Sequence, residues 1–418
     1  MEKIKIGVLG GHRGLSMVNY CVNAKDVELV AICDKSDAVL SYCENWLKER
    51  GHQVTLYKDF NDFLSAGMDA VVLANYANEH APFAVECLKR GIHVMSECLP
   101  VETLAQAVEL CEAVEQSGKV YYYAENYCYF PATQEMKKLY KNGTLGAFEY
   151  AECEYLHDCE SIWPQITYGE PNHWRNLMSA FYYVTHSMGP IIHITGLRPV
   201  KVSGFAVPLN DKVRRMGAQG DSYAIEMVTM ENGGIVKSAH GTAPSQSSIW
   251  YSMYGTKGRV ESGREGYSHN LGEVHLLAEG VPACVGGSTL SYDTRPEDFE
   301  NAKDFGHWGG DYYTMKNFVK AIRGEKDADF ISVYEALDAY FVGHFGYFSN
   351  LNGGAPEEIP NFRNPAERER YRFDTRCCNP KVAKEGELLP SNPKGNVEYP
   401  QSLYDEIHQK YLKKNREN

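Results

Sequence analysis

The stretch IKIGVLGGHRG, residues 4–14, decides the fold of this chain. Residues 4–9 are a short apolar run of the kind that forms a buried β-strand, and glycines follow it at positions 10, 11 and 14. A glycine turn between a strand and a helix lets backbone N–H groups and the helix N-terminus approach a diphosphate. The loop is one residue too short for the pattern G-x-G-x-x-G, so the prediction of a dinucleotide site needs support from the neighbouring sequence.

Strand-like and helix-like segments alternate around this loop. Their alternation over residues 1–124 predicts a doubly wound parallel sheet, a Rossmann domain. The predicted strands are Ile4–Leu9, Val27–Cys33, Asp69–Ala74, His93–Ser96 and Lys119–Tyr123, and the predicted helices are Asp37–Arg50, His80–Arg90 and Thr103–Ser117.

An aspartate supports the prediction of a dinucleotide site. Asp34 ends the second predicted strand, about 20 residues after the glycines, where a carboxylate can accept hydrogen bonds from both ribose hydroxyls. The same carboxylate would repel a 2′-phosphate, which favours NAD over NADP, although the neighbouring Lys35 weakens that preference. The alternative is a tight turn followed by an unrelated surface aspartate.

The pattern changes after Glu125. Long strand-like segments follow one another with few helices between them, and Asn232-Gly233-Gly234 is a typical hairpin turn. Such a run predicts an α/β domain with an open, largely antiparallel sheet over residues 125–360. The segment 361–418 is rich in Pro, Arg, Glu and Lys and is expected to wrap the surface or a neighbouring subunit.

Composition narrows the class of protein. The chain has 418 residues, 43% of them hydrophobic, and a net charge of −13, which fits a soluble two-domain enzyme and argues against nucleic-acid and membrane partners. No secretion signal and no membrane-spanning run is visible, so a cytoplasmic location is expected. The twelve cysteines contain no C-x-x-C pair, and His157, Asp158 and Glu160 fit no standard ligand spacing, so no metal is assigned.

Five further segments resemble the Gfo/Idh/MocA family of oxidoreductases, which includes glucose–fructose oxidoreductase and inositol dehydrogenase. They follow the family's order between residues 4 and about 360, and their combination is specific although each alone is not. The segments are NYANEHAP (75–82), GIHVMSECLP (91–100), YGTKG (254–258), GHWGGD (306–311) and VYEA (333–336).

The resemblance implies a Rossmann domain followed by an α/β domain, with the nicotinamide of NAD between them. It also implies a sugar-like small-molecule substrate and a homo-oligomer. The residues that it assigns to the cofactor are Gly10, Gly11, His12, Arg13, Asp34, Asn75, Tyr76, His80, Glu97, Cys98 and Asn126.

Two positions depart from the family's pattern. Cys98 replaces a lysine that helps to position the reacting hydroxyl, and Tyr182 stands where the family often has an aspartate four residues before its catalytic histidine. A glycoside-acting subgroup, the NAD-dependent α-N-acetylgalactosaminidases and their relatives, also lacks the lysine. Similar to that subgroup are ENYCY (125–129), YLHD (155–158), WR (174–175) and YVTHSMGP (183–190).

His186 and Tyr183 are the predicted catalytic residues. An unperturbed imidazole has a pKa of about 6.5, so His186 could take a hydroxyl proton near neutral pH, and Tyr183 could act as a second acid or base. The alternatives are a structural histidine and an aromatic core residue. The predicted substrate-binding residues are Glu125, Tyr155, Arg175, Tyr182 and His307.

Several of these residues also have a purely structural explanation. Glu125 and Arg175 could instead form internal ion pairs. Trp163, Trp174 and Trp308 could stack on a sugar or fill the core.

Three functions fit these observations. The favoured one is an NAD-dependent dehydrogenase that oxidises a ring hydroxyl of a sugar or glycoside, with the 3-hydroxyl preferred, to a ketosugar. The second is a redox-neutral glycosidase, in which transient 3-oxidation is followed by elimination of the aglycone and hydration. The third is a catalytically inactive sugar- and NAD-binding protein, for which loss of the lysine at position 98 is the only support.

Overall fold

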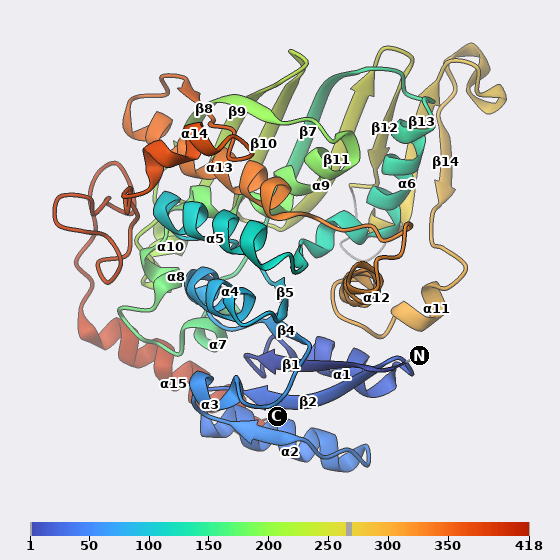
Figure 1. Cartoon of the computed structure of the whole chain (residues 1–418). Helices are drawn as coiled ribbons and strands as arrows, with labels where there is room; N and C mark the ends of the chain where they lie inside the picture. Colours follow the sequence, from blue (N-terminus) through green and yellow to red (C-terminus); the bar gives the residue numbers. More distant parts are fainter. Residues whose placement is uncertain (1, 265–269, 418) are drawn as a thin grey trace. The chain divides into compact units, whose positions relative to one another are not determined.

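The computed structural model describes residues 2–264 and 270–417, and the chain divides into two compact units (Figure 1). The first unit comprises Met1–Phe130, Arg295–Leu337 and Asn361–Phe373, and the second comprises Pro131–Thr294, Asp338–Pro360 and Asp374–Asn418. The domain limits predicted after residues 124 and 360 stay predictions.

The first unit contains a six-stranded parallel sheet in the order β3-β2-β1-β4-β5-β6. This is the Rossmann order, in which the direction of winding reverses between β1 and β4, and dinucleotides bind beyond the carboxyl ends of the strands at that point. The strands are β1 (Ile4–Leu9), β2 (Val27–Cys33), β3 (Thr55–Tyr57), β4 (Ala70–Leu73), β5 (His93–Ser96) and β6 (Tyr121–Tyr123).

Local sequence signals define the helices of this unit. Ser36 caps α2 by accepting from the backbone N–H of Val39, and Thr103 and Gln106 form a capping box at the start of α5, which ends at Gly118 in the left-handed conformation. The helices and 3-10 turns are α1 (Leu15–Asn23), α2 (Asp37–Glu49), α3 (Phe60–Phe63), η1 (Ala77–Glu79), α4 (His80–Lys89), α5 (Leu104–Ser117), η2 (Asn126–Tyr129), α11 (Phe299–Ala302), α12 (Gly310–Ile322), α14 (Pro365–Arg368) and η6 (Glu369–Tyr371).

The second unit is built on a nine-stranded mixed sheet in the order β14-β13-β12-β11-β7-β10-β9-β8-β15. Every adjacent pair is antiparallel except β7 and β10, and the predicted turn at Asn232-Gly233-Gly234 joins β9 to β10. The strands are β7 (Phe148–Leu156), β8 (Pro199–Val207), β9 (Tyr223–Met230), β10 (Ile235–Gly241), β11 (Ser248–Gly255), β12 (Gly258–Ser262), β13 (Glu273–Ala278), β14 (Leu290–Asp293) and β15 (Glu357–Glu358).

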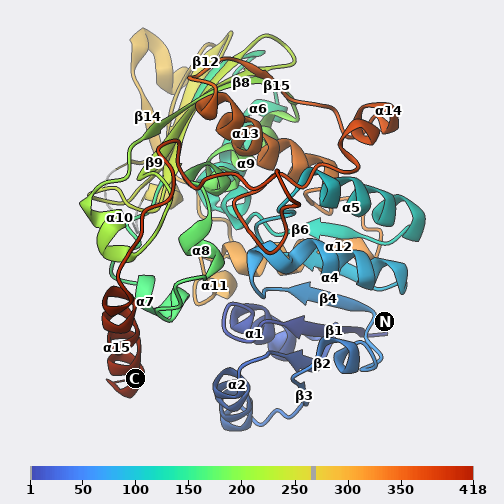
Figure 2. The same cartoon turned by 90° about the vertical axis from the view of Figure 1, so that its left-hand side faces the viewer.

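Helices α6 and α9 lie on the same side of this sheet and contact each other (Figure 2). Helix α13 (Val333–Leu351) passes from the ranges of the first unit to those of the second after Leu337. The remaining helices and 3-10 turns are α6 (Pro131–Lys141), α7 (Trp163–Thr167), α8 (Trp174–Leu177), η3 (Ala180–Tyr183), α9 (Thr185–Thr195), α10 (Asp211–Met216), η4 (Asn270–Gly272), η5 (Pro282–Gly287) and α15 (Gln401–Glu417).

The predicted fold class is confirmed: a parallel Rossmann sheet is followed by an open sheet that is mostly antiparallel. The strands that were not predicted from the sequence are β3, β12, β13, β14 and the two-residue strand β15. Among the described residues, no helix is long and apolar enough to span a membrane.

Candidate functional site

The glycine loop after β1 is closed tightly against the loop after β4. Gly10 has a φ of +94°, and a Cβ atom there would lie 2.4 Å from the backbone carbonyl carbon of Ala74. Its N–H donates to the carbonyl of Cys33 at 2.8 Å, and its own carbonyl accepts from the N–H of Gly14 at 2.9 Å, one residue before α1 begins. Position 10 therefore admits only glycine, and the loop leads directly into the helix N-terminus.

Asp34 holds this loop to the end of β2. Its carboxylate accepts from the N–H of Gly11 and from the N–H of Ser36, both at 2.9 Å. The ammonium of Lys35 lies 3.8 Å from the ring centre of Tyr76, a cation–π contact between this turn and the loop after β4. The predicted cofactor residues Gly10, Gly11 and Asp34 thus lie together, and His12 in the same loop is exposed.

These residues fit NAD. The loop has no room for a side chain at the point where a diphosphate would approach, and the carboxylate of Asp34 stands where the ribose is expected. The side-chain oxygens of Asn75 and Asn126 are buried without a hydrogen-bond partner among the described residues, so both can accept from a bound group. Asn126 is also held in place, since its amide donates to Asp311 at 3.0 Å.

An ion-pair network surrounds Arg13, the charged residue of the glycine loop. Its guanidinium donates to both carboxylate oxygens of Asp311, at 2.8 and 2.9 Å, and to Glu97 at 2.5 Å. Burial alone would raise the pKa of the Asp311 carboxyl, but the guanidinium of Arg13 and the hydrogen bond with His307 hold it well below its usual range. Asp311 was not among the predicted site residues, although it ends the segment GHWGGD.

His307, predicted to bind substrate, belongs to the same network. Its Nδ1 lies 3.2 Å from the Asp311 carboxylate. His307 and Trp308 have φ values of 54° and 55°, and Gly309 follows at 79°. Such left-handed conformations are rare outside glycine and cluster at functional sites.

His80 joins the loops that follow β4 and β5. One ring nitrogen lies 3.0 Å from the carbonyl of Leu99, and the other lies 3.2 Å from the carbonyl of Asn75. Burial lowers the pKa of His80 to about 4, so the ring is neutral at neutral pH. A neutral ring carries one N–H and donates to only one of the two carbonyls, so His80 lies between the two loops and is hydrogen-bonded to one of them.

Cys98 and Glu125 form a contact at the end of the first unit's sheet. The thiol donates to the Glu125 carboxylate at 3.2 Å. Burial, with the charges of Glu125 and Glu97, raises the pKa of Cys98 well above its usual value, so the sulfur stays protonated.

Aromatic side chains form a second candidate site in the second unit. The ring of Tyr155 from β7 is stacked on Tyr183 at 5.6 Å and lies 4.5 Å from the ring of His186. Arg175 from α8 donates to the Tyr183 hydroxyl at 3.0 Å, and Tyr155 is hydrogen-bonded to His157 at 3.1 Å. Four predicted residues from separate elements therefore come together.

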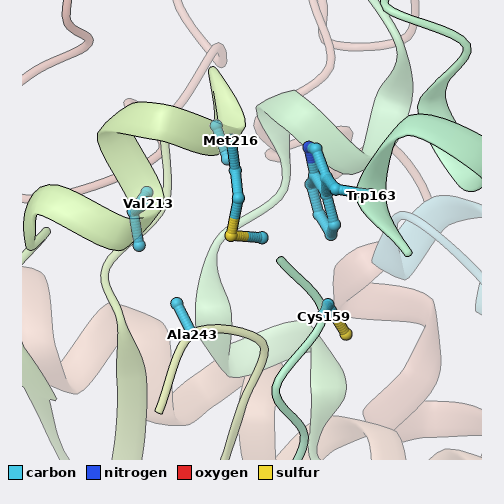
Figure 3. Packing of buried hydrophobic residues seen from close by; sticks show 6 residues of the cluster. Cys159, Trp163, Val213, Met216 and Ala243 are labelled. Carbon is cyan, nitrogen blue, oxygen red and sulfur yellow. The ribbon is translucent and has the colours of Figure 1, made fainter. Parts of the chain in front are cut away.

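A small core holds the segment that carries Arg175. Trp163 is 1% exposed and packs with Cys159 and Met216 (Figure 3). Its indole N–H donates to Asn176 at 2.9 Å, next to Arg175. Trp163 is therefore a core residue, and stacking on a sugar is excluded for it in this structure.

Tyr182 and Tyr183 are neighbours with different surroundings. The ring of Tyr182 packs with Tyr340, His344 and Tyr347, and its hydroxyl is buried with no hydrogen-bond partner among the described residues. Its predicted role in substrate binding stays a prediction.

Two acidic residues near the aromatic cluster are engaged in ion pairs. Asp158 pairs with Lys212 at 2.9 Å, and Glu160 pairs with Arg215 at 2.7 Å.

Comparison with known proteins adds to this geometry. Residues 4–125 match the model of the Gfo/Idh/MocA family, described as an oxidoreductase family with an NAD-binding Rossmann fold. A glycosyl hydrolase family 109 protein of Stenotrophomonas maltophilia is 22% identical over 431 residues, which cover 89% of this chain and 92% of that protein. A second protein of that family, from Phocaeicola vulgatus, is 24% identical and covers 87% of this chain and 78% of its own length.

Solved structures show the same fold. A levoglucosan dehydrogenase in complex with NADH and L-sorbose has a TM-score of 0.70 and 16% identity, covering 87% of this chain and all of that one. An inositol dehydrogenase homologue from Azotobacter vinelandii, in complex with NADH and myo-inositol, has a TM-score of 0.66 and 14% identity, covering 85% of this chain and 98% of that one.

The parallel sheet, the glycine loop and Asp34 define an NAD-binding protein with a Rossmann domain. Over residues 4–125 the chain matches the Gfo/Idh/MocA family of oxidoreductases. Over most of its length it is similar to glycosyl hydrolase family 109 proteins.

Proposed function

We propose that this protein is an NAD-dependent glycosidase that acts by transient oxidation of the sugar's 3-hydroxyl, elimination of the aglycone and hydration. The observation that carries the proposal is the aromatic cluster in which Arg175 donates to Tyr183, Tyr183 stacks on Tyr155, and Tyr155 contacts His186. The two relatives compared by sequence over most of the chain are glycosyl hydrolase family 109 proteins, which supports this route over the dehydrogenase favoured from the sequence.

Each residue of the cluster has a defined task in this proposal. The imidazole of His186 takes the proton of the 3-hydroxyl, since imidazole titrates near neutral pH. The hydroxyl of Tyr183 takes the proton from carbon 2, because a guanidinium that donates to a phenol oxygen stabilises negative charge there. Tyr155 and Arg175 orient the sugar. NAD, when bound, accepts the hydride from carbon 3 and later returns it.

Atoms and electrons balance over the whole cycle. Oxidation at carbon 3 acidifies the proton at carbon 2. When Tyr183 removes that proton, the electron pair forms the double bond between carbons 1 and 2 and breaks the bond from carbon 1 to the aglycone oxygen, which takes the proton from Tyr183 and leaves as an alcohol. Water then adds to carbon 1, a proton returns to carbon 2, and reduction restores the 3-hydroxyl. The net reaction is hydrolysis without consumption of NAD.

The test is a panel of glycosides incubated with the enzyme and NAD in deuterated water. We expect a free reducing sugar with deuterium at carbon 2 and no net NADH, detected by mass spectrometry and absorbance. A ketosugar formed in equal amount with NADH, without deuterium at carbon 2, would show a dehydrogenase instead. Binding of NAD without conversion of any glycoside would support the inactive alternative.

A further inference from the structure

A buried polar chain lies beneath the aromatic cluster. Glu226 on β9 and His240 on β10 have completely buried side chains, and Nε2 of His240 lies 3.2 Å from Oε1 of Glu226. The two atoms are close, but they are not aligned as a hydrogen bond. Buried polar groups in such an arrangement destabilise a fold, so their presence calls for a reason other than packing.

Both groups are neutral at neutral pH. Burial raises the pKa of Glu226 well above its usual range, and the nearby hydroxyl of Ser238 only partly opposes the shift. Burial also lowers the pKa of His240 to about 3. The pair is therefore a carboxylic acid beside a neutral imidazole, and a small rotation of the carboxyl group would let its O–H donate to Nε2.

The buried polar contacts continue from His240 to the start of helix α9. Nδ1 of His240 lies 3.3 Å from the hydroxyl of Ser238 and 3.4 Å from that of Ser187, and the two hydroxyls are 2.8 Å apart. The Ser187 hydroxyl donates at 2.9 Å to the carbonyl of Val184, the residue that precedes α9. The polar chain thus ends on the helical turn that carries His186.

Two other contacts link this turn to the proposed catalytic cluster. The hydroxyl of Tyr251 on β11 donates to the carbonyl of His186 at 2.6 Å. His240 is the register partner of Tyr155 in the parallel pair β10–β7, and its imidazole interacts electrostatically with that of His186. The rings of Tyr155 and Tyr183 face His186 at 4.5 and 5.9 Å.

We propose that His240, with Glu226 behind it, is a positioning residue that fixes the imidazole of His186 through Ser238 and Ser187. The proposal rests on the proposed function only for the role of His186 as proton acceptor. With the carboxyl of Glu226 rotated to donate to Nε2, neutral His240 turns Nδ1 toward the serines, so the loss of either group loosens the first turn of α9. The carboxyl of Glu226 acts as a neutral partner and not as a counter-charge.

The test compares four variants of the full chain. Ser187→Ala and Glu226→Leu break the polar chain, whereas Glu226→Gln keeps a neutral group that can donate to Nε2. Thr195→Val is the matched control, because it removes another side-chain hydroxyl that donates to a backbone carbonyl of α9, that of Ile191, at the opposite end of the helix. The readouts are kcat and KM against pH, and titration of the His186 imidazole by NMR, assigned by its loss in His186→Asn.

For Ser187→Ala and Glu226→Leu, we expect kcat to fall about tenfold with KM changed less than about twofold, since small misplacement of a catalytic group costs rate more than binding. The His186 titration midpoint should move by about half a pH unit or more in the same variants. Glu226→Gln and Thr195→Val should match the wild type, and circular dichroism checks that each variant is folded.

Two results would overturn the proposal. One is a His186 titration in Ser187→Ala and Glu226→Leu that matches the control. The other is a Glu226→Gln variant as impaired as Glu226→Leu, which would mean that Glu226 acts by its charge. If the wild type converts no glycoside, the proposed function fails. The NMR titration still decides whether the polar contacts from Glu226 to Ser187 position His186.

Discussion

The glycine loop of the first unit and the aromatic cluster of the second unit are built from different parts of the chain. At the loop, the requirement is the absence of a side chain at Gly10, where the backbone passes close to Ala74. In the cluster, the requirement is the placement of four side chains from β7, α8, η3 and α9. Any side chain at Gly10 should therefore cause a large loss of NAD affinity. In the cluster, the loss of kcat should depend on which functional group is removed.

The largest effect is expected for Gly10→Ala. The new Cβ would meet the backbone at 2.4 Å, so the loop must move away from the diphosphate. We expect NAD affinity to fall about 1,000-fold, equivalent to about 4 kcal/mol, as measured by calorimetric titration.

The control for this change is Gly67→Ala. Gly67 also has a positive φ, +69°, but a Cβ there meets nothing within 4 Å. That variant should lose only about 1 kcal/mol of unfolding free energy and bind NAD within about twofold of wild type. Equal losses of affinity in both variants would show that backbone strain, and not the contact at Ala74, governs the loop.

Replacing His186 tests the other side of the comparison. We expect His186→Asn to lower kcat by about 100- to 1,000-fold, since it removes the proposed proton acceptor, and to leave NAD affinity unchanged. His193→Asn is the control, because it changes a histidine in the last turn of the same helix, where the ring contacts Lys137 at 2.7 Å. Comparable losses of kcat in the two variants would contradict a catalytic role for His186.

A pH effect on stability is expected in the first unit. The pKa of His80 is lowered to about 4, so the unfolded chain binds a proton below about pH 6.5 that the folded chain does not. Stability contributed by neutral His80 is therefore complete above pH 6.5 and is lost as the pH falls toward 4. Between pH 8 and pH 5 the loss is about 2 kcal/mol.

Urea unfolding of His80→Gln measures this contribution, because the variant should lose about 2 kcal/mol of the wild-type pH dependence. His52→Gln, at an exposed position, serves as the control and should keep the wild-type profile. An unchanged pH dependence in His80→Gln would mean that the ring takes up its proton at the same pH in the folded and the unfolded protein.

The difference between the two regions also explains what the sequence could predict. Gly10, Gly11 and Asp34 form a local pattern, so their proximity followed from the strand and helix signals around them. Asp311 was missed because it reaches Arg13 across 298 residues of sequence, and only the fold brings the two together. The directions of Tyr182 and Tyr183 depend on the 3-10 turn η3, which apolar periodicity does not predict.

Those adjacent tyrosines allow a finer test of the cluster. Tyr183→Phe removes the hydroxyl that accepts from Arg175 and is the proposed acceptor of the carbon-2 proton, so we expect kcat to fall about 100-fold. Tyr182→Phe removes a buried hydroxyl without a partner among the described residues, so kcat and stability should stay close to wild type. If Tyr182→Phe is the more damaging of the two, the predicted substrate contact of Tyr182 gains support and the proposed role of Tyr183 loses it.

The smallest effect on NAD affinity and kcat is expected for replacement of Cys98. This replacement tests whether the first unit depends on a specific side chain outside the glycine loop. Its pKa is raised well above the usual value by burial and by Glu125 and Glu97, so the neutral thiol should resist iodoacetamide at pH 8. Cys98→Ala should change NAD affinity and kcat by less than about threefold, because the thiol contributes one weak hydrogen bond to Glu125. A tenfold loss of NAD affinity in that variant would contradict this difference between the two regions. It would show that cofactor binding by the first unit depends on a specific side chain, as the activity of the aromatic cluster does.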